Sequence, residues 1–209
     1  MKNNAPKALD ILNDLSINRE EVASFDDVLT LNSCWKRHML VGDIDPEVGV
    51  AVESFIRFWN QIDDELGLAP EDREPIKIFI DSGGGDLCAT FTMIDAIKMS
   101  TTPIWTINIG AAYSGGFFTF IAGHKRFAYP LSTFLYHEGS TGNIGDAGKF
   151  RNFADFYDKQ LDMLKAITTQ NTRITDEMYR DHKKDDWWMT AEEALELGVC
   201  DEITKEFIQ

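Results

Sequence analysis

Cysteine is scarce in this 209-residue sequence, which contains only Cys34, Cys88 and Cys200. The three cysteines are isolated, odd in number and form no Cys-x-x-Cys pair, which argues against a disulfide framework and against a cysteine-based zinc cluster. No other residues show metal-ligand spacing, so we expect neither a metal nor another cofactor in the chain. Isolated thiols suit a reducing compartment, and we expect a cytoplasmic protein.

Long apolar runs and an excess of positive charge are also missing. No run approaches the ~20 residues that span a bilayer, and residues 1–4 lead into no signal-peptide apolar segment. We therefore expect no membrane association. Lysine and arginine together number 20, against 35 aspartates and glutamates, which gives a net charge of −15. Because such a surface repels phosphate groups, we expect no nucleic-acid partner.

The remaining composition is that of an ordinary globular domain. Hydrophobic residues make up 44% of the chain, and the 14 Phe and 5 Trp exclude disorder. A chain of this length buries roughly 70% of its unfolded surface. Residues 1–25 contain a short stretch with apolar residues at helical spacing, followed by charged residues. No later segment repeats this pattern. We predict an N-terminal appendage over residues 1–25 and a single domain over residues 26–209.

Apolar runs and helical periods alternate along this domain. Strands are predicted at residues 37–41, 76–80, 104–109, 126–129 and 132–136. Helices are predicted after Asp45-Pro46, from Leu87, over 117–122, from Phe150 and after Thr190. The alternation predicts an α/β fold with a largely parallel sheet and flanking helices.

Two turns rich in small residues directly follow predicted strands, which is where open α/β sheets place their functional sites. The turn over residues 110–116 carries Ser114, followed by two glycines. Glycine after a nucleophile relieves crowding and lets a backbone N–H approach a substrate oxygen. The motif Gly-x-Ser-x-Gly is matched only in part, because Ala112 occupies its first position. Ser114 is therefore either a nucleophile or an ordinary turn serine.

The other turn is Asp81-Ser-Gly-Gly-Gly-Asp86. It lacks the lysine and the Ser/Thr of a phosphate-binding loop, and Cys88 stands where a dinucleotide motif needs its third glycine. The turn fits better as a source of backbone N–H groups for an oxyanion.

A serine nucleophile needs a base, and the chain offers four histidines. His137 ends a predicted strand and opens a glycine-rich loop, as an imidazole projecting from a sheet end would. A strand-end histidine bonded only to backbone would occupy the same position. The other three are predicted to be structural or solvated, in a strand, a surface turn and a charged helix: His38, His124 and His182.

An orienting carboxylate is the third requirement of such a site. Asp185 and Asp186 stand directly before Trp187-Trp188-Met189. A carboxylate beside tryptophans is partly desolvated, which strengthens its hydrogen bond to an imidazole N–H. A solvated acidic turn is the alternative interpretation of these two residues.

The order and spacing of these segments together resemble the proteolytic subunit of the Clp protease. The resemblance covers about residues 37–204. It rests on the runs Ile76-Lys-Ile-Phe-Ile-Asp-Ser-Gly-Gly-Gly85, Ile109-Gly-Ala-Ala-Tyr-Ser-Gly-Gly116, Leu135-Tyr-His-Glu-Gly139 and Asp186-Trp-Trp-Met-Thr-Ala-Glu-Glu-Ala-Leu-Glu-Leu-Gly-Val-Cys-Asp-Glu-Ile203. The order serine, histidine, aspartate also differs from that of α/β-hydrolases, in which the histidine comes last.

The resemblance implies a serine endopeptidase that hydrolyses unfolded proteins or peptides. Ser114 would be the nucleophile, His137 the general base and Asp186 the carboxylate that orients it, while Gly85 and Gly115 would supply the oxyanion N–H groups. The implied fold is of the Clp/crotonase type, with a protruding handle helix that starts near Phe150. The implied assembly is a homo-oligomer of heptameric rings stacked as a tetradecamer, served by an AAA+ ATPase unfoldase.

Several positions depart from the pattern of that family, which indicates a divergent member. The family usually has proline at Gly83, glutamine at Glu138 and arginine at Asp185, and its N-terminal axial-loop sequence is not matched by residues 1–30. Two other functions are therefore considered. One is a non-catalytic ring or scaffold subunit, and the other is a crotonase-type acyl-CoA enzyme, which has no use for a serine–histidine–aspartate set.

Overall fold

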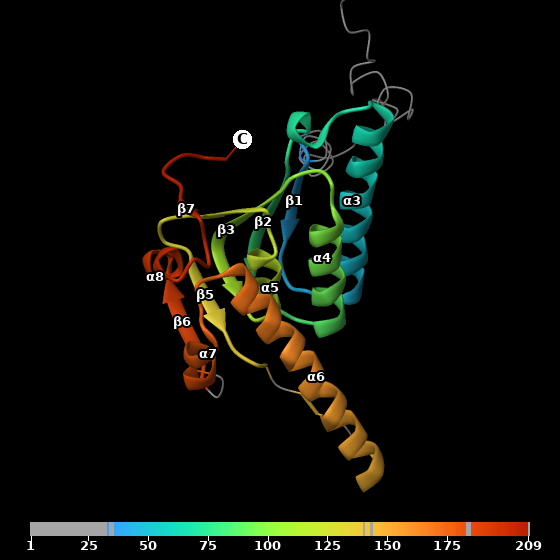
Figure 1. The fold of residues 1–209 in the computed structure, drawn as a ribbon, viewed down its shortest axis with the longest axis vertical. Coiled ribbons are helices and arrows are strands. Elements are labelled where there is room, and N and C mark those ends of the chain that lie inside the picture. The colour runs from blue at the N-terminus through green and yellow to red at the C-terminus, as the bar shows by residue number, and fades with distance from the viewer. Residues whose placement is uncertain (1–32, 34–35, 140, 143, 183–184, 209) are drawn as a thin grey trace, which may run out of the picture.

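The computed structural model describes residues 33, 36–139, 141–142, 144–182 and 185–208. The predicted appendage, residues 1–25, lies outside this part of the chain. Figure 1 shows a central sheet with α3 and α4 side by side on one flank, and a long helix, α6, that runs away from the body.

Within the described residues, seven strands form the sheet, and most of them are parallel. The parallel path runs in the order β1 (His38–Val41), β2 (Ile76–Ser82), β3 (Ile104–Tyr113), β4 (Lys125–Ala128) and β7 (Glu202–Ile203). The far end of β3 pairs in parallel with β5 (Thr133–Tyr136), which pairs antiparallel with β6 (Trp187–Thr190). The predicted α/β class with a largely parallel sheet is confirmed.

The helices of the described residues are α3 (Pro46–Glu65), α4 (Leu87–Met99), α5 (Gly115–Ile121), α6 (Ala147–Asn171), α7 (Asp176–His182) and α8 (Ala191–Glu196), with a short 3₁₀ turn η2 (Pro70–Asp72). A side-chain cap begins α3, α4, α6 and α8, and the sequence marks two of these caps, Asp45 and Thr190. Asp45 accepts the N–H of Val48 at 2.8 Å at the start of α3. Thr190 and Glu193 form a reciprocal capping box at the start of α8.

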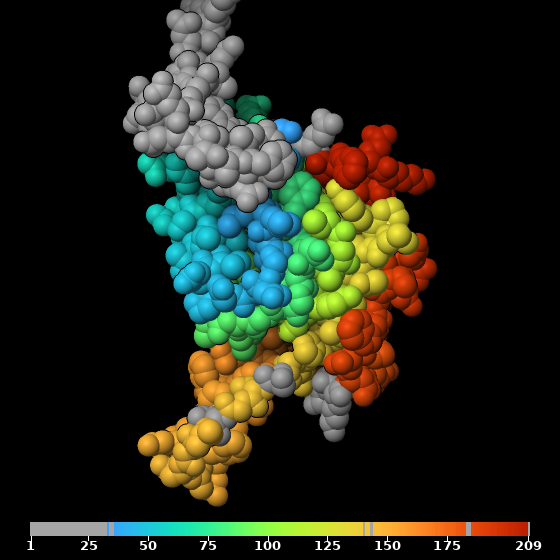
Figure 2. Space-filling model, turned by 180° about the vertical axis from the view of Figure 1, so that it is seen from behind, coloured from blue at the N-terminus to red at the C-terminus, as the bar shows by residue number. Residues whose placement is uncertain are grey.

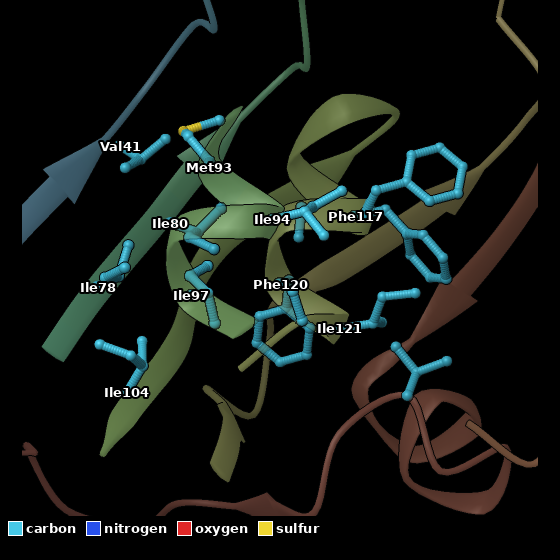
Figure 3. Close-up of a cluster of buried hydrophobic side chains, with 14 of the residues drawn as sticks. Val41, Ile78, Ile80, Met93, Ile94, Ile97, Ile104, Phe117, Phe120 and Ile121 are labelled. Carbon is cyan, nitrogen blue, oxygen red and sulfur yellow. The ribbon is translucent and has the colours of Figure 1, made fainter. Parts of the chain in front are cut away.

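The hydrophobic core lies between the sheet and helices α3, α4 and α5. Figure 3 shows aliphatic side chains of β2 and β3 meeting side chains of α4 and α5. The helix α5 is buried at every position, as predicted for residues 117–122. Fully burying one Ile or Phe side chain stabilises a protein by about 1.5–3 kcal/mol, so this cluster fixes the turn from which α5 begins.

The buried residues of α6 lie in its second half. Leu164 and Thr168 are buried there, whereas Phe150 and Phe156 in the first half are 52% and 57% exposed. The projection is visible in Figure 1, and from behind in Figure 2, where the start of α6 extends below the body. The protruding handle helix is therefore present, and its exposed aromatics are not part of the core. None of the helices within the described ranges is long and apolar enough to cross a membrane.

The strand before Ser114 extends well beyond its predicted end at residue 109. The turn predicted over residues 110–116 is still strand as far as Tyr113, because Ala111, Ala112 and Tyr113 pair with β5. A carboxylate stabilises this irregular stretch: Asp81 Oδ1 accepts the N–H of Ala111 at 3.0 Å, beside a register shift between β2 and β3. The turn itself is therefore shorter and tighter than the sequence indicates, and Ser114 stands at its centre.

Candidate active site

Ser114 joins the end of β3 to the start of α5 in an unusual backbone conformation. Its φ is 53° and its ψ is −120°, a backbone conformation that is rare for residues other than glycine. Holding a residue in such a conformation costs about 1–3 kcal/mol of stability. Hydrogen bonds on both sides hold it there: its N–H donates to Leu135 O at 2.9 Å, and its carbonyl accepts the N–H of Phe118 at 3.2 Å. This geometry matches the strained strand-to-helix turn that presents a nucleophile.

The glycines that follow Ser114 are required by close packing. A Cβ on Gly115 would lie 2.5 Å from Thr90 Oγ1, and one on Gly116 would lie 2.9 Å from Ser82 Cβ. Both distances are shorter than real contacts allow. The two glycines therefore let α5 begin directly against the side chains of Thr90 and Ser82, with Ser114 at its N-terminus.

His137 and Asp186 are brought together by the pairing of β5 with β6. The last pair of this antiparallel ladder joins Tyr136 to Trp187. His137, which follows Tyr136, therefore lies beside Asp186, which precedes Trp187. His137 Nδ1 lies 3.5 Å from Asp186 Oδ1. This distance is beyond a well-formed hydrogen bond, and the Asp186 side chain is 59% exposed. The ion-pairing contact exists, but it is loose and solvated.

Ser114 and His137 line one pocket of about 480 Å³. His137 Nε2 is buried and has no hydrogen-bond partner in the part of the chain that the structure describes, so the bond to Ser114 Oγ is not formed. A neutral imidazole with its proton on Nδ1 facing Asp186 leaves the Nε2 lone pair free to accept a proton. Catalytic hydrogen bonds are often long in unliganded enzymes and tighten when substrate binds.

The glycine turn after β2 lies against Ser114. A Cβ on Gly84 would lie 2.7 Å from Ser114 Cβ, and a Cβ on Gly115 would lie 3.5 Å from the backbone nitrogen of Gly85. On the other side of the turn, a Cβ on Gly85 would lie only 1.9 Å from the carbonyl oxygen of Ile44. The φ of Gly85 is +150°, so this position requires glycine both sterically and conformationally.

Two backbone N–H groups of these turns remain available to a substrate. The bridge between Ile44 and Gly85 is made by Gly84 O and by the N–H of Asp86, and the N–H of Gly85 donates to no group among the described residues. The N–H of Gly115, at the first position of α5, likewise donates to no group within the described residues. Gly85 and Gly115 both line the pocket beside Ser114.

Glu138, directly after His137, is bonded to two tyrosines that the sequence analysis did not connect with the site. Tyr157 of α6 donates to the Glu138 carbonyl oxygen at 2.8 Å, and Tyr179 of α7 donates to Glu138 Oε1 at 3.3 Å. Burial, together with the nearby Glu138 charge, raises the pKa of Tyr179 to about 12 and also raises that of Tyr157. Both phenols are therefore neutral donors at physiological pH.

Asp86 and Glu138 are the acidic side chains that line the pocket, and no lysine or arginine of the described residues lines it. The other three histidines lie outside the pocket. His38 packs edge-on against Phe79 and His182 stacks on Trp187, while His124 Nδ1 accepts a backbone N–H. Within the described part of the chain, no three His, Cys, Asp or Glu side chains group as a metal site would need.

The fold and the site define an α/β protein that brings a serine, a histidine and a carboxylate together at one edge of a largely parallel sheet, beside a turn of glycine N–H groups. This chain belongs to the Clp protease family, whose family model matches residues 59–207. Family membership supports a peptidase function.

Three curated relatives are each described as an ATP-dependent Clp protease proteolytic subunit 2. The Thermobifida fusca protein is 33% identical over 157 residues, which cover 68% of this chain and 76% of that protein. The Treponema pallidum protein is 29% identical over 135 residues, with 64% of this chain and 68% of the relative covered. The Treponema denticola protein is 30% identical over 134 residues, with 63% and 67% covered.

Proposed function

We propose that this chain is a serine endopeptidase that hydrolyses peptide bonds of unfolded proteins or peptides. The observation that carries the proposal is the pocket shared by Ser114, His137 and the N–H groups of Gly85 and Gly115. The strained conformation of Ser114 supports it, because strain of this kind persists where the surrounding structure holds a functional group in place.

The reaction follows from the positions of these groups. His137 Nε2 takes the proton of the Ser114 hydroxyl as its oxygen attacks the peptide carbonyl, and the Nδ1 proton faces Asp186, which stabilises the imidazolium. The N–H groups of Gly85 and Gly115 bind the oxyanion. The imidazolium then gives its proton to the departing amine, and water, deprotonated by His137, hydrolyses the acyl-enzyme to restore Ser114.

Assembly and partners are also part of the proposal. We infer a cytoplasmic homo-oligomer of heptameric rings stacked as a tetradecamer, in which the exposed Phe150 and Phe156 of α6 become buried between rings. An AAA+ ATPase unfoldase would deliver polypeptides, so ATP would act through that partner. At −15 per subunit, ring association should strengthen as salt screens the repulsion. Sedimentation that finds only monomers from low to high salt would contradict the barrel.

The direct test is reaction with a fluorophosphonate, followed by intact-mass measurement of the wild type and of Ser114→Ala. A single adduct on the wild type and none on the variant is the expected result. Hydrolysis of an unfolded protein should be lost in the same variant. Equal adduct formation on both proteins, or equal hydrolysis rates, would overturn the proposal.

One observation favours a second candidate, a non-catalytic ring or scaffold subunit. The Nε2 atom of His137 has no partner in the described residues, and the contact between His137 and the exposed Asp186 is long. In that case a folded, assembled particle would form no adduct at any pH, and adding an unfoldase would not change this result.

A further inference from the structure

The chain directly after His137 is held from two sides. Glu138 receives a hydrogen bond on its carbonyl oxygen from Tyr157 and another on its carboxylate from Tyr179, at 2.8 and 3.3 Å. The two tyrosines come from different helices, α6 and α7, and the two acceptor atoms belong to different parts of Glu138. Together they restrain both the backbone and the side chain of the residue next to the proposed base.

This restraint falls where the sheet no longer supplies one. The ladder of β5 ends at Tyr136, so His137 lies beyond its last paired residue. Gly139 follows with a φ of +76°, and residues 137–139 pair with no strand within the part of the chain that the structure describes. Without further contacts, the imidazole would sit on a strand end that is free to move away from Asp186.

The donors themselves are well fixed. Tyr179 is only 5% exposed and packs against Tyr136, which is 1% exposed, with 5.4 Å between the ring centroids. Tyr157 is half-buried and lines the same pocket as Ser114 and His137. The bond from Tyr157, at 2.8 Å, has the usual length, whereas the contact from Tyr179 to the carboxylate, at 3.3 Å, is long for a bond between a hydroxyl and a carboxylate.

We propose that Glu138 is a positioning residue, and that Tyr157 and Tyr179 clamp it so that His137 keeps Nδ1 toward Asp186 and Nε2 toward Ser114. The inference rests on the proposed function and adds a role that the serine, histidine and aspartate do not supply. The clamp touches neither the substrate carbonyl nor the reacting oxygen. Its loss should therefore slow the chemical step without weakening the binding of a small reagent.

The test measures fluorophosphonate labelling as two quantities, the maximal rate kinact and the half-saturating concentration KI. Glu138→Ala and Tyr179→Phe should each lower kinact by about tenfold or more, because a misplaced base costs rate steeply, and should leave KI within about twofold. The double variant should be no slower than the slower single variant, because both changes remove the same bond. Glu138→Gln should restore most of kinact, since its amide oxygen still accepts from Tyr179.

Two further variants make the result specific. Tyr157→Phe breaks the clamp from the α6 side and should also lower kinact, so the test survives if Tyr179→Phe fails to fold. Tyr129→Phe removes a tyrosine hydroxyl outside this pocket, and its kinact should be unchanged. Thermal unfolding and sedimentation of every variant identify loss of fold or assembly. Unchanged kinact in Glu138→Ala and Tyr157→Phe, or a Glu138→Gln as slow as Glu138→Ala, would overturn the inference.

A second readout separates this inference from the proposed function. Ring-labelled histidine spectra, with the His137 signal assigned from His137→Gln, report the orientation of the imidazole whether or not Ser114 reacts. The His137 signal should shift or broaden in Tyr179→Phe and remain unchanged in Tyr129→Phe. A wild type that is never labelled, with the shift present, defeats the proposed function alone. Normal labelling with an unchanged signal in Tyr179→Phe defeats the clamp alone.

Discussion

Tyr136 and Trp187 form the last cross-strand pair between β5 and β6, and this pair sets the distance of 3.5 Å between His137 and Asp186. Because the pair ends the ladder, both residues of the proposed couple lie just outside regular structure. The exposure of Asp186 at 59% means that water competes for its carboxylate. Its contribution to catalysis should therefore be smaller than that of a buried triad carboxylate.

Asp186→Asn should lower the fluorophosphonate labelling rate by about 10- to 10³-fold, less than the ~10⁴-fold loss in a buried triad. The amide removes the charge that stabilises the imidazolium and does not hold the Nδ1–H tautomer. Asp185→Asn is the matched control, since it removes the same charge one residue earlier. Equal losses in the two variants would mean that only the overall negative charge matters, and would contradict the assigned role of Asp186.

Gly85→Ala should abolish activity while Gly83→Ala should not. A Cβ on Gly85 would meet Ile44 O at 1.9 Å, so the turn must move and carry its N–H away from the pocket. Loss of one oxyanion donor costs about 10²–10³-fold in rate. The nearest atom to a Cβ on Gly83 is Asp43 Oδ1 at 3.7 Å, an ordinary contact. Labelling rates and thermal unfolding of both variants check the prediction, and a fully active Gly85→Ala would refute it.

Local signals in the sequence predict most of the strands and helices, while the roles of Ser114, His137 and Asp186 stay predictions. Caps such as Asp45 and Thr190 act within one helical turn, so the sequence shows them directly. The strand β6 was not predicted, because four residues with two adjacent tryptophans carry no clear period, and its pairing with β5 decides the matter. The strand β3 extends beyond the predicted boundary for the same reason: pairing with β5 overrides the low strand propensity of Gly110 and its neighbours.

Contacts between distant segments could not be predicted in this way. Tyr179 lies 41 residues from Glu138 and Tyr157 lies 19 residues from it, and nothing in the spacing of either tyrosine indicates a hydrogen bond. The hydroxyl of Tyr157 becomes significant only once the fold carries α6 past the end of β5.

Breaking the ion pair between Arg37 and Asp63 should destabilise the fold strongly. Asp63 is fully buried, and its carboxylate accepts hydrogen bonds from the two terminal guanidinium nitrogens of Arg37 at 2.7 and 2.8 Å. The Thr102 hydroxyl also donates to this carboxylate, at 2.7 Å. The guanidinium also lies over the Trp59 ring at 4.3 Å. Asp63→Asn leaves a buried cation without its counter-charge, which costs about 3–5 kcal/mol. Urea unfolding followed by tryptophan fluorescence measures the change.

The exposed pair between Arg57 and Glu53 on α3 is the control for this measurement. Its side chains are 69% and 34% exposed, so water and salt screen the attraction. Arg57→Ala should change the urea midpoint much less than Asp63→Asn. Comparable losses from the two variants would show that the buried pair has no special importance.

Acidification below neutral pH should weaken the fold through His124. Its backbone N–H donates to Ile104 O, and its Nδ1 accepts the N–H of Ile104 at 3.0 Å, a contact that requires a neutral ring nitrogen. Burial lowers the pKa of His124 below the usual 6.5. Below pH 6.5 the unfolded chain therefore binds a proton that the folded chain does not, so stability falls as the pH falls toward the folded pKa.

The pH range of this effect follows from the same linkage. Between pH 7.5 and 5.5 the unfolded histidine gains its proton, so the free energy of unfolding should fall through His124, by an amount that solvent screening at this exposed side chain reduces. His124→Asn keeps an oxygen that can accept from Ile104 but cannot titrate, so its stability should depend less on pH over this range. His38, whose pKa burial also lowers, accounts for part of what remains. Urea titrations at the two pH values compare the proteins, and equal pH dependence in wild type and His124→Asn would show that His124 is not the group responsible.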